Sequence, residues 1–349
     1  MLHAVVTSDW HLEGLSKHFP VDHIDRQLNE IDKIYQYALS RGIHHVIVPG
    51  DITDRHHCTD STKSKLLAFF RKYDGIIHTW YVGGNHDRAD INRTSVDLFK
   101  EFCEWDFFKT LHIFTKPEQV EIEGVVCNML PHPSVEAIKH KKRACLNFVH
   151  TDIVGAIGDN GRALKTTKTV KTNEGDFTIG GHIHLHQYLK KQRFLLCGNP
   201  FQKNFGESLP KGLVEIKAKY KKSGELKVDW QFVESRPDFV FETVVIKESS
   251  QFSTLKVSPG IRYRLYVAED VVIPNDLKVT VPNIAQLHRV KGSVAKNLEE
   301  KMELGFVAVD TINPKEGLKE FMVSYGLNKT ERTLGRNMLR EALSEIGLQ

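Results

Sequence analysis

Three segments in the first hundred residues share one pattern, in which a short apolar run ends in a small polar cluster. The three clusters are Asp9 with His11, then Gly50-Asp51, and then the GGNHD stretch at 83–87. Amphipathic stretches at 22–41 and 61–73, with apolar residues at helical spacing, separate the runs. Strands that alternate with helices predict an α/β fold with parallel strands. Ligands collect at the carboxyl ends of such strands, so we expect the three clusters to converge.

The later chain changes character twice. Six short apolar runs between residues 124 and 233 predict a second sheet packed on the first. Residues 238–308 mix expected strands with a helical stretch around 294–302 and predict a small α+β domain, with the strands at 240–246, 263–268 and 277–281. Asn328 followed by Glu331 resembles a helix N-cap with its reciprocal partner, ahead of an apolar stripe. We therefore expect three parts, at 1–235, 236–310 and 311–349.

Composition excludes several classes of protein. No run of about 18 apolar residues occurs, which argues against a membrane span. The N-terminus lacks a signal-like region, so we expect a cytoplasmic protein. The five cysteines are scattered without a CxxC pair, which argues against a thiolate zinc site. A net charge of +4 is too small to indicate nucleic acid by itself, although basic residues cluster at 139–143, 190–193 and 217–222.

The polar clusters, together with histidines that follow two later strands, make a set of nitrogen and oxygen donors. Its members are Asp9, His11, Asp51, Asn85, His150, His182 and His184. Each alone has an ordinary alternative as a turn residue or a hydrogen-bonded histidine. Together they suit Mn²⁺, Zn²⁺, Fe²⁺ or Mg²⁺. Seven donors are too many for one ion, but they suit two ions about 3.5–4 Å apart that share a carboxylate.

The order of these elements resembles the calcineurin-like metallophosphoesterase superfamily. D-x-H, GD, GNHD, H and GHxH follow one another, and the resemblance covers roughly residues 1–215. It implies a two-sheet αββα sandwich. Two stretches, LLCGNPFQKNFGESLPKGLVEI at 195–216 and GHIHLHQ at 181–187, are similar to the SbcD class of DNA double-strand-break nucleases. The chain length is similar to phage-encoded nuclease subunits.

The resemblance also implies roles for individual residues. Asp9, His11 and His184 would hold one ion, Asn85, His150 and His182 the other, and Asp51 would bridge the two. The ions would be Mn²⁺, with Mg²⁺ as an alternative. His86 would orient or protonate the leaving oxygen as a catalytic residue. Asp87 would fix the tautomer of His86.

One position departs from the pattern of that class. Some members carry a phosphate-contacting histidine three residues after the bridging aspartate, where this chain has Asp54. Arg55 and His57 are the candidates for the phosphate or DNA contact, and ordinary surface-loop positions are the alternative.

His182, His184 and His186 stand at i, i+2 and i+4, a spacing that points side chains of an extended chain to one side. Alone they suggest one tridentate site. With the other donors in view, His182 and His184 are interpreted as ligands of different ions and His186 as a residue outside the set. Gly180 and Gly181 would let the backbone pass close to the site.

Three functions compete on this sequence. The first is a DNA nuclease, exonucleolytic on duplex ends and endonucleolytic on single strands, which acts with an SbcC-like coiled-coil ATPase in recombination and repair. The 236–310 domain would cap DNA, the 311–349 tail would bind the ATPase, and a homodimer would form through the early helices. The second is a phosphatase or small-molecule phosphodiesterase, which needs neither extra part. The third is a non-catalytic scaffold, which the complete donor set argues against.

Overall fold

The computed structural model describes residues 1–291 except 91–92, 135, 141, 160, 168–169 and 208–209. The tail expected at 311–349 and the helical stretch expected around 294–302 therefore lie outside the described residues. Within the described part of the chain, no helix is long and apolar enough to cross a membrane.

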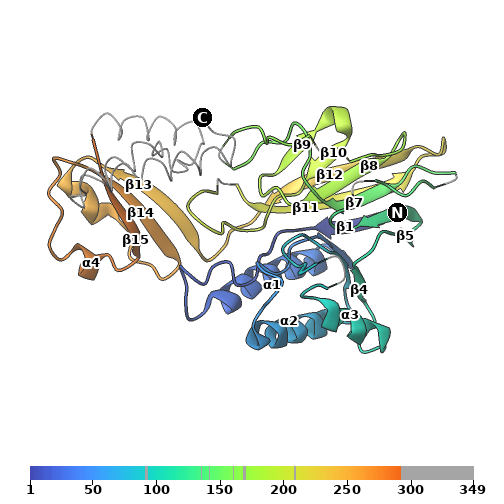
Figure 1. Ribbon diagram of the computed structural model, residues 1–349, viewed down its shortest axis with the longest axis horizontal. Coiled ribbons are helices and arrows are strands. Elements are labelled where there is room, and N and C mark those ends of the chain that lie inside the picture. The colour runs from blue at the N-terminus through green and yellow to red at the C-terminus, as the bar shows by residue number, and fades with distance from the viewer. Residues whose placement is uncertain are drawn as a thin grey trace, which may run out of the picture. The chain divides into compact units, whose positions relative to one another are not determined.

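The first sheet contains the parallel strands expected from the early apolar runs, and its strand order is β12-β11-β1-β2-β3-β4. The parallel strands are β1 (Leu2–Val6), β2 (His45–Pro49), β3 (His78–Val82) and β4 (Leu111–Phe114). Both expected helices form, and a third follows them, as α1 (His23–Ser40), α2 (Asp60–Tyr73) and α3 (Asp97–Glu104). The three helices lie on one side of this sheet (Figure 1).

Two of the strands expected in the second sheet instead extend the first sheet. β11 (Gly212–Tyr220) pairs antiparallel with β1, and β12 (Leu226–Glu234) pairs with β11. That part of the prediction is wrong. Apolar alternation shows which face of a strand is buried, but it does not show which neighbour the strand pairs with.

The second sheet forms from the remaining runs, with the order β5-β6-β7-β8-β10-β9. Its strands are β5 (Glu118–Ile122), β6 (Val125–Leu130), β7 (Leu146–His150), β8 (Phe177–Gly181), β9 (Gln187–Leu189) and β10 (Phe194–Leu196), with the short helix η1 (Lys190–Gln192) before β10. Four of these strands run parallel, namely β6, β7, β8 and β10. Their carboxyl ends therefore lie at one edge of the sheet, where ligands bind in α/β folds.

Alternating side chains of β1 build both interior layers. Leu2, Ala4 and Val6 lie in the apolar core that also contains second-sheet residues. Val5 lies in the other core, against the helices. The period-two alternation of a strand places its neighbours on opposite faces, so one short strand serves two layers. The expected α/β two-sheet sandwich is thus the fold. On the outer face of the second sheet, the described side chains pack against loop segments rather than a helix.

A three-stranded parallel sheet follows the sandwich and has its own apolar core. Its elements are β13 (Val240–Ile246), η2 (Ser249–Thr254), β14 (Ile261–Ala268), α4 (Leu277–Thr280) and β15 (Ile284–Val290). The strands expected at 240–246 and 263–268 are confirmed. We call this unit, residues 240–290, the C-terminal module.

The strand expected at 277–281 is a short helix, so that prediction is wrong. Leu277 and Val281, four residues apart, are both buried, whereas Val279 between them is 82% exposed. A strand would bury Val279 along with the other two. Pro282 then ends the turn because it has no N–H to donate.

Candidate metal centre

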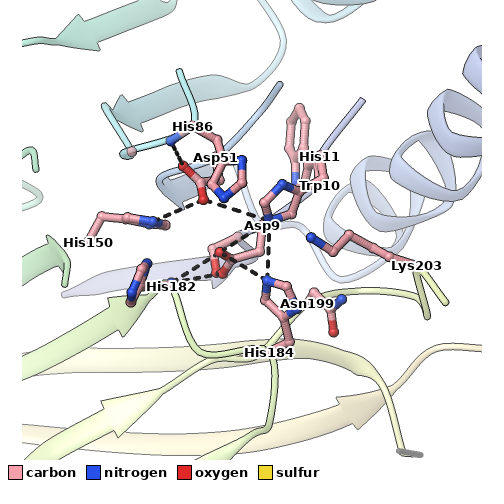
Figure 2. A network of polar contacts seen from close by, with 12 residues as sticks. Asp9, Trp10, His11, Asp51, His86, His150, His182, His184, Asn199 and Lys203 are labelled. Carbon is pink, nitrogen blue, oxygen red and sulfur yellow. Dashed lines mark hydrogen bonds and ion pairs between the residues drawn. The ribbon is translucent and has the colours of Figure 1, made fainter. Parts of the chain in front are cut away.

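The polar clusters that follow five strands meet at one edge of the two stacked sheets (Figure 2). They follow β1, β2 and β3 of the first sheet and β7 and β8 of the second. The structure brings together all seven residues predicted as ligands, namely Asp9, His11, Asp51, Asn85, His150, His182 and His184. The carboxyl ends of parallel strands share an edge, which explains how residues up to 175 positions apart, such as Asp9 and His184, become neighbours.

Several of these residues have an unusual backbone. The φ angles of Asp9, His11, Asp51 and His182 are 57°, 44°, 54° and 81°, all in the left-handed region. Such conformations cost about 1–3 kcal/mol each in non-glycine residues and are concentrated at functional sites. They turn the chain sharply after each strand, so that the side chain points into the centre.

Two glycines allow the close approach of the clusters. A Cβ atom on Gly50 would lie 1.9 Å from His150 Nδ1, and one on Gly84 would lie 2.1 Å from Asp51 Oδ1. Gly181 has the same role between the sheets, because its Cβ would lie 2.2 Å from the Pro49 carbonyl oxygen. The glycines of the GD, GN and GH motifs are therefore required by space around the donors.

Asp9, His11 and His184 form the first group of donors. His11 Nε2 lies 3.2 Å from His184 Nε2, and Asp9 Oδ1 lies 3.8 and 3.7 Å from these two nitrogens. Donors bound at right angles about 2.1 Å from one ion are about 3 Å apart. The separations are close to that value, so the group fits a divalent cation.

Asn85, His150 and His182 form the second group. Asn85 Oδ1 lies 2.9 Å from His150 Nε2 and 2.9 Å from His182 Nδ1. The rings of the two histidines stand edge to face, with centroids 5.1 Å apart. An amide oxygen and two imidazole nitrogens converge here, and this group also fits a divalent cation.

Asp51 lies between the two groups. Its Oδ2 atom is 3.2 Å from His150 Nε2 in the second group and 3.7 Å from His11 Nε2 in the first. Its Oδ1 atom accepts a hydrogen bond from the backbone N–H of His86. One buried carboxylate thus faces both groups, as expected of a carboxylate shared by two ions.

The outward nitrogens of three histidines are hydrogen-bonded to fixed acceptors. His150 Nδ1 donates to the Pro49 carbonyl at 2.8 Å. His184 Nδ1 lies 2.8 Å from Glu207 Oε1, and His182 Nε2 lies 2.9 Å from Asp152 Oδ1. A carbonyl or carboxylate beside one ring nitrogen holds the proton there and turns the other nitrogen, with its lone pair, toward a metal. This arrangement independently supports metal binding by the centre.

The ionisation states of the buried groups favour cation binding. Burial outweighs the opposing contact with Asp54 and lowers the pKa of His11 to about 4, so its ring is neutral near pH 7. Burial and the nearby His150 also lower the pKa of His182. For Asp51 burial opposes ionisation, but the attraction of His150 and His11 outweighs it and holds the Asp51 pKa well below its usual range. Neutral His11 and His182 beside an ionised Asp51 are the forms that bind a divalent ion. His150 is the exception, because the Asp51 carboxylate raises its pKa to about 10, so an ion in the second group must displace a proton from that ring.

Glu207 is a functional candidate that the sequence did not reveal. Its buried carboxylate accepts from His184 through Oε1 and from Asn199 Nδ2 through Oε2, and Lys211 Nζ lies 3.3 Å from Oε2. Glu207 stands 23 residues from His184 in a segment without periodicity. Nothing in the spacing of the sequence pairs the two.

Replacing Glu207 by glutamine is expected to weaken binding of one of the two ions by 10–100-fold, because His184 loses its charged anchor. Titration calorimetry with Mn²⁺ measures this. Glu215→Gln is the matched control, since Glu215 is also buried but contacts Tyr37 and His3 away from the centre. Unchanged affinity for both ions in the Glu207 variant would show that His184 is positioned by other contacts.

Asp87 has a different role from the one expected. Its carboxylate is fully buried and accepts from the backbone N–H groups of Asp51, Thr53 and Gly84 and from the Tyr81 hydroxyl. The ring of His86 instead contacts the Asp54 carbonyl, 2.7 Å from His86 Nδ1. The expectation that Asp87 fixes the His86 tautomer is therefore not met. Asp87 ties the loops after β2 and β3 together and so positions Asp51.

His86 stands at the open side of the centre. Its side chain is exposed and its ring meets that of His11 edge to face, with centroids 4.7 Å apart. A carbonyl oxygen can only accept, so the contact with Asp54 requires a proton on His86 Nδ1. The other nitrogen, Nε2, is left for a substrate.

Arg55 and His57 are exposed on the loop after Asp51. The contact recorded for the His57 ring is with His56, at a centroid distance of 4.1 Å. The residue of this loop that contacts a predicted ligand is Asp54, whose Oδ1 lies 3.3 Å from His11 Nδ1. The phosphate contact of Arg55 or His57 stays a prediction.

His186 packs away from both donor groups. Its ring stacks on Phe232 with centroids 4.3 Å apart and meets Trp230 edge to face. Within the described residues, no cluster of possible metal ligands contains it. The interpretation of His186 as a residue outside the ligand set agrees with this packing.

Comparison with known proteins gives one positive finding. A family model described as calcineurin-like phosphoesterase matches residues 2–186, which include every residue of the two donor groups and Asp51. No curated protein matches the chain.

Proposed function

Because the chain belongs to the calcineurin-like phosphoesterase family, we propose that it is a DNA nuclease of the SbcD type. It hydrolyses phosphodiester bonds with two divalent ions, cutting duplex ends exonucleolytically and single strands endonucleolytically. It acts with an SbcC-like ATPase in DNA recombination and repair. A metal-dependent phosphoester hydrolase is the part of this function that the family itself supports.

The donor groups described above would hold the ions. Asp9, His11 and His184 serve one ion, Asn85, His150 and His182 the other, and Asp51 both. The all-nitrogen-and-oxygen donor set suits Mn²⁺, with Mg²⁺ as the alternative. When bound, such ions polarise a phosphoryl oxygen and lower the pKa of water.

The protein's own residues supply orientation and a proton. Asp87 and the glycines hold the loops so that the donors face one another. His86, with Nδ1–H fixed on the Asp54 carbonyl, presents Nε2 to the leaving oxygen; the doubly protonated ring gives the Nε2 proton to that oxygen and is left as the neutral Nδ1–H form. Trp10 and Ile52, which follow Asp9 and Asp51 in the sequence, are buried and exclude water from the backbone that carries these two donors.

The choice of DNA over a small substrate depends on one observation, the C-terminal module and its attachment. Phe241 of β13 donates its N–H to Gln202 Oε1 at 3.1 Å, and Arg264 of β14 donates to the Phe205 carbonyl at 3.0 Å. Both acceptors belong to the loop that carries Glu207. The module is thus joined to a wall of the centre, where an extended substrate would need additional surface.

Partners follow from the same proposal. The module would cap DNA, the 311–349 tail would bind the coiled-coil base of the ATPase, and two copies would associate through the early helices. A phosphatase or small-molecule phosphodiesterase would use the same metal centre, so only substrate specificity separates the two functions.

The test compares two substrates with purified protein and Mn²⁺. The nuclease hypothesis expects degradation of linear duplex DNA, stimulated by the ATPase partner and ATP, at a specific activity above that on bis(p-nitrophenyl) phosphate. Hydrolysis of the nitrophenyl diester with intact DNA, alone and with the partner, would instead establish the small-substrate enzyme. Protein that binds no Mn²⁺ and hydrolyses neither substrate would establish the scaffold.

A further inference from the structure

The loop between β10 and β11 directs one cation toward the metal centre. Figure 2 shows the Lys203 side chain extending from this loop toward His11 and Asp9. It approaches from the side opposite His150 and His182. Lys203 lies beyond the family match, which ends at residue 186.

Contacts on both sides of Lys203 fix its backbone. Gln202 is buried and donates through Nε2 to the Glu207 carbonyl at 2.8 Å. Phe205 is buried against Phe241. Lys203 itself is half-buried, and its backbone N–H donates to Glu207 Oε2 at 3.2 Å. The side chain therefore starts from a fixed backbone, so a ligand that orders its end does not also have to order the loop.

The ammonium group of Lys203 differs from that of its neighbour Lys211. Lys211 is 1% exposed, with Nζ 2.9 Å from Asp159 Oδ1 and 3.3 Å from Glu207 Oε2. Lys203 Nζ has no hydrogen bond or ion pair to any residue within the described ranges. One lysine is thus a buried structural cation, and the other presents an unpaired charge to the centre.

An unpaired ammonium beside two divalent ions is unfavourable unless an anion lies between them. The carboxylates that face the donor groups, Asp9 and Asp51, carry two negative charges, fewer than the four positive charges of two divalent ions. Asp54 and Glu207, which also feel the charge of Lys203, lie at the outward nitrogens of His11 and His184. A phosphodiester brings a negative charge, and more charge develops on its oxygens as the ester bond is displaced. A fixed cation aimed at those oxygens therefore attracts them more strongly in the transition state than in the bound substrate.

We infer that Lys203 binds the substrate phosphate beside the first donor group and stabilises the negative charge that develops on it during hydrolysis. The inference rests on the metal-dependent phosphoester hydrolysis within the proposed function, and it holds for DNA and for a small diester. The competing role is structural: without a hydrogen bond or ion pair to either, the Lys203 charge lowers the pKa of the Asp54 and Glu207 carboxylates, as a minor contribution beside their other partners.

The experiment uses the full-length protein and the variants Lys203→Met, Lys203→Arg and Lys219→Met. Lys219 is an exposed lysine of β11 that pairs with Lys227 of β12, one residue after Ala218, which pairs with Leu2 at the start of β1. It lies away from the centre, so it controls for the loss of one charge. Titration calorimetry measures Mn²⁺ binding and then the binding of inorganic phosphate to the Mn²⁺-loaded protein. Hydrolysis of bis(p-nitrophenyl) phosphate gives kcat and KM.

Lys203→Met is expected to keep the Mn²⁺ stoichiometry, to weaken inorganic phosphate binding about 10-fold and to lower kcat about 10²–10³-fold. Lys203→Arg should retain most of the phosphate affinity, and Lys219→Met should match the wild type. Unchanged phosphate affinity in Lys203→Met would overturn the inference, and so would loss of Mn²⁺ binding. If the wild type leaves DNA intact but its phosphate affinity depends on Lys203, the nuclease proposal fails and this inference stands.

Discussion

Replacing Asp51 by asparagine is expected to abolish binding of at least one divalent ion and to lower phosphodiester hydrolysis by about 10³-fold or more. Asp51 Oδ2 faces His150 in one donor group and His11 in the other, so both ions lose a ligand charge. Transition-state stabilisation by metal ions is worth several kcal/mol, and each 1.36 kcal/mol is a factor of ten in rate.

The same substitution changes the state of His150. Burial disfavours the charged ring, but the adjacent Asp51 carboxylate raises the His150 pKa above its usual range. An asparagine removes that attraction, so the His150 pKa falls and the ring is neutral at pH 7. The fold is expected to survive because the buried histidine can lose its proton instead of remaining an unpaired charge.

Titration calorimetry with Mn²⁺ and hydrolysis of bis(p-nitrophenyl) phosphate measure the two effects. Asp176→Asn is the matched control, because Asp176 is buried too but accepts from the backbone of Cys145 and Asn173, away from the centre. It should lose about 1–3 kcal/mol of unfolding free energy and keep both ions. Asp51→Asn protein that binds two Mn²⁺ ions with wild-type affinity would show that Asp51 is not shared between them.

The ligand set could be named from sequence because its signal is local. Each donor follows a strand within a few residues, and the carboxyl ends of parallel strands must meet at one edge. The prediction of Asp9, Asp51 and Asn85 depended only on the three early strands, whose apolar runs are clear in the sequence. The structure brings all seven together, and their binding of metal stays a prediction that the Asp51 and Glu207 variants test.

The residues that support the ligands could not be found in this way. Glu207 and Asp152 lie in loops, where no periodicity indicates which way a side chain points. Their contacts with His184 and His182 exist only after the second sheet has packed on the first. For Asp87 the sequence predicted a contact that does not form. Its position next to His86 suggested that the two side chains meet, but the Asp87 carboxylate turns back and accepts from the backbone N–H of Gly84.

The two errors in the predicted fold, at residues 212–234 and 277–281, also arise because long-range packing is not visible in a local sequence pattern. The alternation of residues 212–234 correctly indicates two strands, but their pairing with β1 is a long-range choice that the pattern does not contain. At 277–281 the β-branched residues favour a strand on propensity, and burial of Leu277 and Val281 on one face of a helical turn overrides that preference.

Replacing His86 by glutamine is expected to lower DNA hydrolysis by roughly 10²–10⁴-fold while both ions remain bound. The side chain is exposed, and its Nδ1 is held by the Asp54 carbonyl, so Nε2 is free to protonate a leaving oxygen. A sugar alkoxide is a poor leaving group and needs that proton. A nitrophenolate leaves without one, so the variant should hydrolyse bis(p-nitrophenyl) phosphate at close to the wild-type rate.

The ratio of the two activities therefore identifies the role of His86 more sharply than either activity alone. His44→Gln is the matched control, since His44 is exposed just before the amino-terminal end of β2, opposite the centre, and should change neither rate. His86, His11 and Asp54 also form a possible metal-binding cluster, which offers an alternative role for His86 as a ligand. In that case Mn²⁺ affinity and both activities would fall together. Equal losses on DNA and on the nitrophenyl diester, with both ions retained, would instead assign His86 to phosphate binding, because a contact with the phosphate does not depend on the leaving group.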